Sequence, residues 1–180
     1  NEVLALVGRG LQDFSISRAR VKWGIAVPEE PGHVFYVWMD ALANYVTALG
    51  YAEQGDDYRV FWEGADERLH LVGKEIIRFH CLYWPAMLMA AGLPLPGQVY
   101  AHGYLLVGGE KMSKSKLTGI APAQIIDHFG VDAFRYYFLR AIQFGQDGSF
   151  SWEDMSARYT SELANGLGNL ASRATAMVVR

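Results

Sequence analysis

The chain has little of several features that other proteins use for stability or targeting. A single cysteine, Cys81, occurs among 180 residues, so no internal disulfide can form and a cysteine-based zinc site is not expected. No apolar run reaches membrane-spanning length, and the first residues show neither a signal peptide nor an initiator methionine. These absences predict a cytoplasmic protein without a membrane anchor, and they suggest a piece of a longer chain.

What is present is a mildly acidic and largely apolar composition without repeats. Apolar residues make up 51% of the chain, which is enough for a sizeable core and too many for a disordered chain. The net charge of −3 excludes a polybasic protein that coats nucleic acid, although it leaves room for a local basic site. The length fits one domain, or one domain with the start of another.

Three short runs of β-branched and aromatic residues predict buried strands. They lie at residues 34–38, 69–72 and 99–101. Helical patterns separate these runs, and the alternation predicts an α/β fold built on a parallel sheet. Because ligands bind beyond the carboxyl ends of strands in such sheets, residues 38–40, 73–75 and 102–104 are candidates for a binding site.

The two helices between these strands have recognisable limits. Asp40 is a candidate N-cap for a helix over residues 41–49. The second helix, over residues 74–91, is apolar on nearly all sides, so we expect it to be buried, with a kink at Pro85. The polar stretch between them, residues 51–67, is expected to be a surface loop.

The pattern becomes helical after residue 116. Helices are predicted at residues 122–129 and 133–142 and from residue 151 to the end. Pro122 suits the first turn of the first helix, and Asp132 is a candidate cap for the second. Ser151 and Asp154 form a variant of the capping box before the third.

Residues 108–116, with the sequence Gly-Gly-Glu-Lys-Met-Ser-Lys-Ser-Lys, carry the sharpest chemical pattern. Two glycines give the segment a mobile beginning, and three lysines lie close together with small hydroxyls between them. Without partners these charges repel, and a polyanion such as a triphosphate relieves that repulsion. A solvated charged loop is the simpler interpretation of three lysines alone, so composition leaves both interpretations open.

The string Lys111-Met112-Ser113-Lys114-Ser115 resembles the second signature of the class I aminoacyl-tRNA synthetases. Other stretches narrow the resemblance to the methionyl-tRNA synthetase family, and together they cover nearly the whole chain. They lie at residues 13–18, 23–28, 36–45 (YVWMDALANY), 70–80 (HLVGKEIIRFH), 100–104 (YAHGY), 144–149 (FGQDGS) and 167–173 (LGNLASR).

The resemblance implies the second half of a Rossmann-like parallel-sheet nucleotide-binding domain, followed by a helical region. It divides the chain into catalytic-domain residues 1–116, a connecting region at 117–150 and the first helix of an anticodon-binding domain at 151–180. The implied reaction joins methionine and ATP into methionyl-adenylate, releases pyrophosphate and then transfers methionine to tRNA(Met). Mg²⁺ is expected with ATP, and zinc is not expected in this segment.

The same resemblance gives the lysine segment its roles. Lys111 and Lys114 would be the catalytic residues that stabilise the triphosphate in the transition state. Ser113 and Ser115 would help to hold the closed form of the loop, and Met112 lies beside them in the expected ATP-binding set.

The implied methionine pocket is rich in aromatic side chains. Its expected lining is Trp38, Ala41, Tyr45, Ile77 and His80. A thioether favours aromatic edges, and Ala41 and Tyr45, four residues apart, share one helix face. Taken singly, Trp38 and Tyr45 are more often core aromatics and His80 a buried histidine, so only their common placement near strand ends favours a pocket.

The nucleotide side of the implied site starts at Gly73 and Glu75. A carboxylate at a helix start can accept from both ribose hydroxyls, and the helix N-terminus helps to keep it ionised. The family usually carries aspartate at this position, so Glu75 is a departure from the pattern. Gly73 would let the nucleotide approach the backbone, and His102, Gly103 and Tyr104 lie where the adenine ring is expected.

Part of the family pattern is missing. The first signature, a His-Ile-Gly-His type segment, is nowhere in the sequence, so the missing N-terminal half of the catalytic domain is an expected partner. We therefore predict that the chain alone is inactive and poorly stable, because its sheet exposes an unpaired edge. Three other interpretations stay open: a class I synthetase for another apolar amino acid, a non-catalytic tRNA-binding paralogue, and an α/β domain with an incidental lysine loop.

Overall fold

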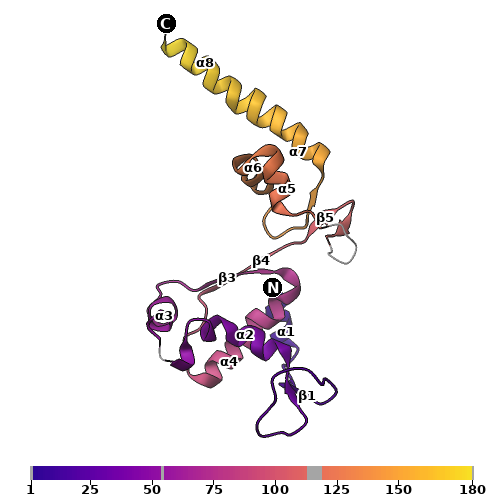
Figure 1. Ribbon diagram of the computed structural model, residues 1–180, viewed down its shortest axis with the longest axis vertical. Helices are drawn as coiled ribbons and strands as arrows, with labels where there is room; N and C mark the ends of the chain where they lie inside the picture. The colour runs from indigo at the N-terminus through magenta and orange to yellow at the C-terminus, as the bar shows by residue number, and fades with distance from the viewer. Residues whose placement is uncertain (1, 54, 113–118, 180) are drawn as a thin grey trace. The chain divides into compact units, whose positions relative to one another are not determined.

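The computed structural model describes residues 2–53, 55–112 and 119–179. Residues 1–101 and 102–180 form two compact units, which we call the first and the second unit (Figure 1). Helices and sheet pieces occur together and one strand pair is parallel, so the predicted α/β class is confirmed. The functional boundaries at residues 116 and 150 stay predictions. In the part of the chain that the structure describes, no helix is both long and apolar enough to cross a membrane.

The first unit places short strands beside a group of helical segments. Its strands are β1 (Ser17–Arg18), β2 (Val34–Phe35), β3 (Leu69–Gly73) and β4 (Gln98–His102), the last of which reaches the boundary between the units. Its α-helices are α1 (Glu2–Gly8), α2 (Val37–Thr47), α3 (Asp56–Tyr58) and α4 (Trp84–Ala91). Shorter 3₁₀ and π-helical segments are η1 (Tyr51–Glu53), η2 (Arg59–Glu63), η3 (Lys74–Ile76) and η4 (Phe79–Tyr83).

β2 is shorter than the strand predicted at residues 34–38, and it belongs to a different sheet. It pairs antiparallel with β1, so that Ser17 is opposite Phe35 and Arg18 is opposite Val34. The prediction of a parallel strand at this place is therefore wrong. The other two predicted strands are present as β3 and β4, which are paired neighbours.

α2 begins four residues before the predicted start, and its N-cap is Tyr36 rather than Asp40. The helical period explains the difference. Trp38, Leu42 and Val46 recur every four residues, and all three belong to or pack against the same core. Trp38 therefore lies in the first turn of a helix instead of at a strand end.

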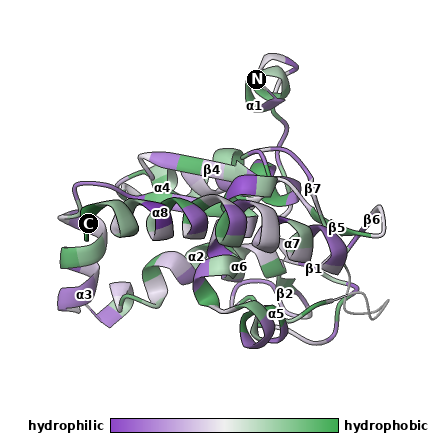
Figure 2. Cartoon of the chain, turned by 90° about the horizontal axis from the view of Figure 1, so that it is seen from above, coloured by the Kyte–Doolittle hydropathy of each residue, from purple (hydrophilic) through white to green (hydrophobic). Residues whose placement is uncertain are grey.

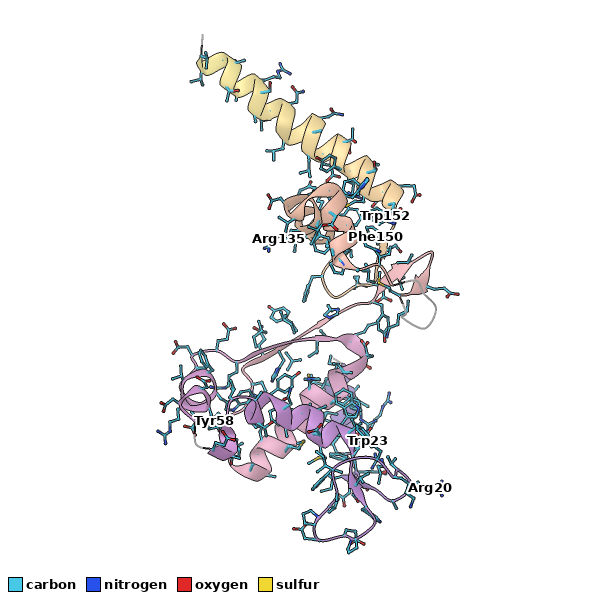
Figure 3. All side chains as sticks on the ribbon, viewed as in Figure 1. Arg20, Trp23, Tyr58, Arg135, Phe150 and Trp152 are labelled. Atoms are coloured by element: carbon cyan, nitrogen blue, oxygen red, sulfur yellow. The ribbon has the colours of Figure 1, made fainter. Side chains whose placement is uncertain are left out.

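The prediction of a surface loop at residues 51–67 is wrong, because most of this segment is helical. η1, α3 and η2 follow one another there, and Tyr58 and Trp62 are both about 5% exposed. These two residues are four apart, so one helical face carries both into the core of the first unit (Tyr58 is labelled in Figure 3). The Trp62 indole N–H also donates to the carbonyl of Pro94 at 3.2 Å.

The predicted helix over residues 74–91 is confirmed as a continuous helical run through η3, η4 and α4. Its buried residues are His80, Trp84 and Leu88, which recur every four residues. One face is therefore buried rather than nearly all sides. Pro85 lies within this run, at the start of α4 directly after η4. Because proline has no N–H, the helical hydrogen bond that its amide would donate is missing there.

The second unit combines a three-stranded sheet with four α-helices among its described residues. The strands are β5 (Leu105–Val107), β6 (Glu110–Lys111) and β7 (Gly148–Phe150). β5 is antiparallel to β6 and parallel to β7. The helical segments are α5 (Pro122–Phe129), α6 (Val131–Ala141), α7 (Trp152–Arg158), η5 (Tyr159–Gly168) and α8 (Asn169–Val178). The sequence patterns predicted the helices but not this sheet.

The helix ends of the second unit test the predicted caps. α5 covers the predicted residues, whereas α6 begins earlier than predicted with Gly130 at its N-cap, so Asp132 as the cap is wrong. The Ser151 hydroxyl accepts a hydrogen bond from the Asp154 amide at 3.1 Å, which confirms the predicted cap. From there α7, η5 and α8 run on as one long helix (Figure 1), along which hydrophobic and hydrophilic residues are mixed (Figure 2).

The core of the second unit joins the sheet to the helices. Tyr137 of α6 and Phe150 of β7 are almost fully buried in one cluster, and their rings meet edge to face at 5.7 Å. The Tyr137 hydroxyl donates to Asp154 Oδ2 at 2.8 Å, and burial followed by this bond raises the pKa of Tyr137 to about 12. β7 is therefore held firmly beside the start of the long helix.

Candidate functional site

An aromatic cluster forms where α2 meets η4 in the first unit. Trp38 stacks on Phe79 with ring centroids 3.8 Å apart and an angle of 9° between the planes. The Trp38 ring also meets the edge of His80 at 6.2 Å. The structure thus brings together two residues that the sequence analysis assigned to one pocket, and it adds Phe79. The sequence analysis missed Phe79, although it directly precedes His80 in an aromatic run.

Hydrogen bonds fix the orientation of the His80 ring within this cluster. Its Nδ1 lies 3.0 Å from the carbonyl oxygen of Ile76, which can only accept, so Nδ1 carries the hydrogen. In the neutral ring Nε2 is then the acceptor, and the Tyr45 hydroxyl donates to it at 2.8 Å. Burial raises the pKa of Tyr45, which keeps this hydroxyl protonated. The two hydrogen bonds therefore hold the His80 imidazole in one orientation.

Ala41 and Ile77, the other two predicted pocket residues, belong to the same two helical runs as the cluster. Ala41 is exposed on α2, and Ile77 is half-buried in the helical run after η3. The ring contacts that join the cluster belong to the aromatic residues. The aromatic part of the predicted set therefore lies together, while the roles of Ala41 and Ile77 stay predictions.

His70 of β3 forms a second layer beneath the cluster. The Trp84 indole N–H donates to His70 Nε2 at 3.2 Å, and the Tyr45 ring lies 4.3 Å from the His70 ring. Burial, followed by repulsion from His80, lowers the pKa of His70. A protonated His70 would lose its acceptor atom, so this packing requires the neutral ring.

The neutral state of His70 predicts a pH dependence of stability. Because its folded-state pKa lies below the unfolded value of about 6.5, the unfolded chain binds more protons as the pH falls, and the free energy of unfolding decreases. His70→Gln keeps an acceptor for Trp84 and removes the titration. We expect the melting temperature of this variant to change less between pH 7 and pH 5 than that of the unsubstituted protein.

The exposed His128 on α5 provides the matched control for this measurement. We expect His128→Gln to keep the pH dependence of the unsubstituted protein. Equal slopes of melting temperature against pH for all three proteins would contradict the assignment to His70.

The Glu75 side chain lies close to the backbone of Gly73 at the end of β3. A β-carbon added at Gly73 would overlap the carboxylate of Glu75, so this carboxylate folds back over the Gly73 α-carbon. Glu75 itself lies in η3, the first turn of the helical run that leads to α4. Glu75 thus lies in the first helical turn as predicted, while ribose binding by Glu75 and nucleotide approach at Gly73 stay predictions.

Three of the predicted nucleotide residues, His102, Gly103 and Tyr104, line a cavity of about 310 Å³ in the second unit. One side of its lining is residues 102–105. The other side is residues 138, 139 and 142–146. Gly103 is where these segments come closest, because a β-carbon there would overlap the backbone of Gln146. Nothing larger than hydrogen fits at this position.

The two glycines before the lysines form a defined turn, while their mobility stays a prediction. Gly108 and Gly109 have φ values of +61° and +80°, and they connect β5 and β6 as a two-residue hairpin. Lys111 is consequently held in β6 opposite Leu106. Its ammonium nitrogen lies 3.9 Å from the centroid of the Tyr104 ring.

Of the remaining predicted residues of the lysine segment, only Met112 lies within the described residues. The Met112 amide donates to the carbonyl of Leu105 at 3.1 Å, which extends the β5–β6 pairing. Ser113, Lys114 and Ser115 lie outside the described residues. Within the described ranges, no group of three or more His, Cys, Asp or Glu side chains could hold a metal ion.

Curated relatives of the chain carry one common name. It is 65% identical to a methionine–tRNA ligase of Streptomyces coelicolor over 99% of its own length and 32% of the relative's. It is 54% identical to a methionine–tRNA ligase of Rhizobium meliloti over all of its own length and 34% of the relative's. The chain therefore spans about one third of the length of these relatives.

A solved structure gives the same result for the fold. The methionyl-tRNA synthetase of Mycobacterium tuberculosis in complex with methionyl-adenylate matches with a TM-score of 0.84 and 49% identity. The match covers 99% of this chain and 35% of that one. The family model described as "tRNA synthetases class I (M)" matches residues 1–175. The chain, whose fold and lysine segment agree with that assignment, belongs to the class I tRNA synthetases of this family.

Proposed function

We propose that this chain is part of a methionine–tRNA ligase. In the complete ligase the carboxylate of methionine attacks the α-phosphorus of ATP, pyrophosphate leaves, and methionyl-adenylate forms. Methionine then passes to the 3′ end of tRNA(Met). ATP enters as its Mg²⁺ complex, so the metal arrives with the substrate. The cluster of Trp38, Tyr45 and His80 is the observation that carries this proposal.

The chemistry of the cluster suits a methionine side chain. Stacked and edge-on aromatic rings offer the contacts that a polarisable thioether favours. The imidazole of His80 is oriented by hydrogen bonds to Ile76 and Tyr45, so the cluster is preorganised. We therefore assign Trp38, Ala41, Tyr45, Ile77 and His80 to methionine.

The lysine segment supplies the phosphate side of the reaction. Lys111 and Lys114 would neutralise the charge that develops on the leaving pyrophosphate. Glu75 would bind the ribose, Gly73 would admit the nucleotide, and residues 102–104 would lie along the adenine. The hairpin through Gly108 and Gly109 gives Lys111 a fixed starting position for this task.

Exposed apolar side chains indicate that another part of the complete ligase packs against this chain. The Trp23 side chain is 90% exposed, and it helps to line an open apolar cavity of about 530 Å³ beside β1 and β2 (Trp23 is labelled in Figure 3). Exposed apolar patches of this kind mark interaction surfaces. We propose that the N-terminal part of the catalytic domain covers this patch in the complete ligase.

The test of the function is methionine-dependent exchange of pyrophosphate into ATP, measured on this chain and on the complete ligase. We expect exchange in the complete ligase, with methionine preferred over a panel of apolar amino acids, and none in the chain alone. Exchange with another amino acid would reassign the substrate. No exchange with any amino acid would instead support a non-catalytic paralogue.

Trp38→Ala in the complete ligase tests the pocket. The stacked ring supplies a large apolar contact worth about 1.5–3 kcal/mol, so the KM for methionine should rise about tenfold to a hundredfold. The KM for ATP should change much less, and Trp38→Phe should keep most of the methionine affinity. Equal increases in both KM values would show that Trp38 supports the fold as a whole instead of the pocket.

A further inference from the structure

A turn at residues 145–148 holds the backbone of Tyr104 from both sides. The Tyr104 amide donates to Asp147 Oδ1 at 2.7 Å, and the Gly148 amide donates to the Tyr104 carbonyl at 2.9 Å. Two adjacent residues of the turn therefore bind both backbone polar groups of Tyr104. Because the first acceptor is a carboxylate, that bond is charge-assisted and stronger than a bond between neutral groups.

The Tyr104 ring connects this backbone to a lysine of the signature. The Lys111 ammonium nitrogen lies 3.9 Å from the ring centroid, which is within the range of a cation–π interaction. β5 begins one residue after Tyr104, and its pairing with β6 places Lys111 opposite Leu106. A shift of the Tyr104 backbone would therefore disturb the ring contact of Lys111 and the strand pairing that carries it.

The turn is itself tied to the buried core of the second unit. Gly145 has a φ of +83°, and Gly148 begins β7, which pairs in parallel with β5. Two residues further on, the Phe150 side chain is 2% exposed and packs against Tyr137 (Phe150 is labelled in Figure 3). Asp147 thus connects a rigid core to the backbone that carries the ring beneath Lys111.

We propose that Asp147 is a positioning residue for Lys111. The Asp147 carboxylate fixes the Tyr104 backbone and thereby the position of the Tyr104 ring. The ring in turn places the Lys111 ammonium group for binding the triphosphate. Asp147 touches no substrate in this role. The inference rests on the proposed function, because that function gives Lys111 its task. A carboxylate that served only the stability of the turn would leave the rate per folded molecule unchanged.

Two substitutions in the complete ligase separate these roles. Asp147→Ala removes the acceptor, and Asp147→Asn keeps an oxygen in its place. We expect Asp147→Ala to lower kcat for pyrophosphate exchange about tenfold to a hundredfold, since small misplacements of a reacting group have effects of this size. The KM for methionine should stay within about twofold of the unsubstituted value. Asp147→Asn should recover most of the lost rate. Asp127→Ala, which removes an exposed carboxylate on α5, is the matched control and should leave kcat unchanged.

A double-substitution cycle tests whether the effect passes through the lysine. In a Lys111→Met background, Asp147→Ala should cause little further loss of kcat, because its target is already absent. An equal loss of kcat in both backgrounds would overturn the proposal. So would an Asp147→Asn variant that fails to restore the rate. A third contrary result would be an Asp147→Ala variant whose melting temperature falls while its kcat is unchanged. Failure of the proposed function itself is distinguishable, because the unsubstituted ligase would then show no exchange with methionine.

Discussion

Gly103→Ala in the complete ligase is expected to lower the free energy of unfolding by about 3 kcal/mol and the rate of pyrophosphate exchange by about a hundredfold. The added methyl group would overlap the carbonyl group of Gln146 and crowd the Asp147 amide. These are backbone atoms, so no rotation of a side chain relieves the overlap. The segment before β5 and the turn before β7 would have to move apart.

The loss of activity follows from what that separation breaks. Asp147 and Gly148 hold the Tyr104 backbone only while the two segments stay in contact at Gly103. The cavity of the second unit, whose lining includes His102, would change shape at the same time. We expect the KM for ATP to rise more than the KM for methionine, because the predicted methionine residues belong to the first unit.

Gly97→Ala is the control for Gly103→Ala. A β-carbon at Gly97 meets its nearest neighbour, the Arg68 carbonyl, at an ordinary distance of 3.8 Å, and its amide can keep donating to that carbonyl. Thermal unfolding and exchange should both stay near those of the unsubstituted ligase. If Gly103→Ala behaved in the same way, the close packing of residues 103 and 146 would not matter for either property.

The helices could be predicted because their periods and caps are local. Ser151 begins the long helix through its own hydroxyl, and Gly92 ends α4 with a φ of +69° that glycine adopts without strain. The aromatic cluster was partly predictable for a similar reason. Trp38 and Tyr45 come from one helix, while His80 comes from a separate helical run after β3, so family resemblance was needed to join the two.

The errors occurred where tertiary contacts outweighed local pattern. A β-branched and aromatic run at residues 34–38 fits a strand, yet only Val34 and Phe35 form one, and the packing of Trp38 on the same face as Leu42 draws the end of the run into α2. Residues 51–67 read as a polar loop because most of them are polar, and only the four-residue spacing of Tyr58 and Trp62 indicated a buried helical face.

The sheet of the second unit could not be predicted for a different reason. β6 contains two residues, and β5 and β7 contain three each, so none offers an alternation long enough to recognise. Its register depends on a hairpin at Gly108 and on a parallel pairing between segments about forty residues apart. The contact between Asp147 and Tyr104 also joins residues 43 apart in the sequence, so no local pattern indicates it.

Lys111→Met in the complete ligase is expected to lower kcat for pyrophosphate exchange about a hundredfold to a thousandfold, with a much smaller change in the KM for ATP. Methionine retains the length and apolar stem of the side chain, so packing on the Tyr104 ring persists while the charge is lost. A cation at this position assists most when negative charge accumulates on the leaving pyrophosphate. The effect should therefore appear in the chemical step rather than in ATP binding.

Two further variants identify the source of this effect. Lys22→Met removes an exposed lysine of the first unit and should leave kcat unchanged, which excludes a general effect of net charge. Tyr104→Phe keeps the ring beneath Lys111 and should retain most of the rate. If Lys111→Met raised the KM for ATP and left kcat unchanged, Lys111 would contribute equally to the ground state and the transition state, and the catalytic role would fall to Lys114 alone.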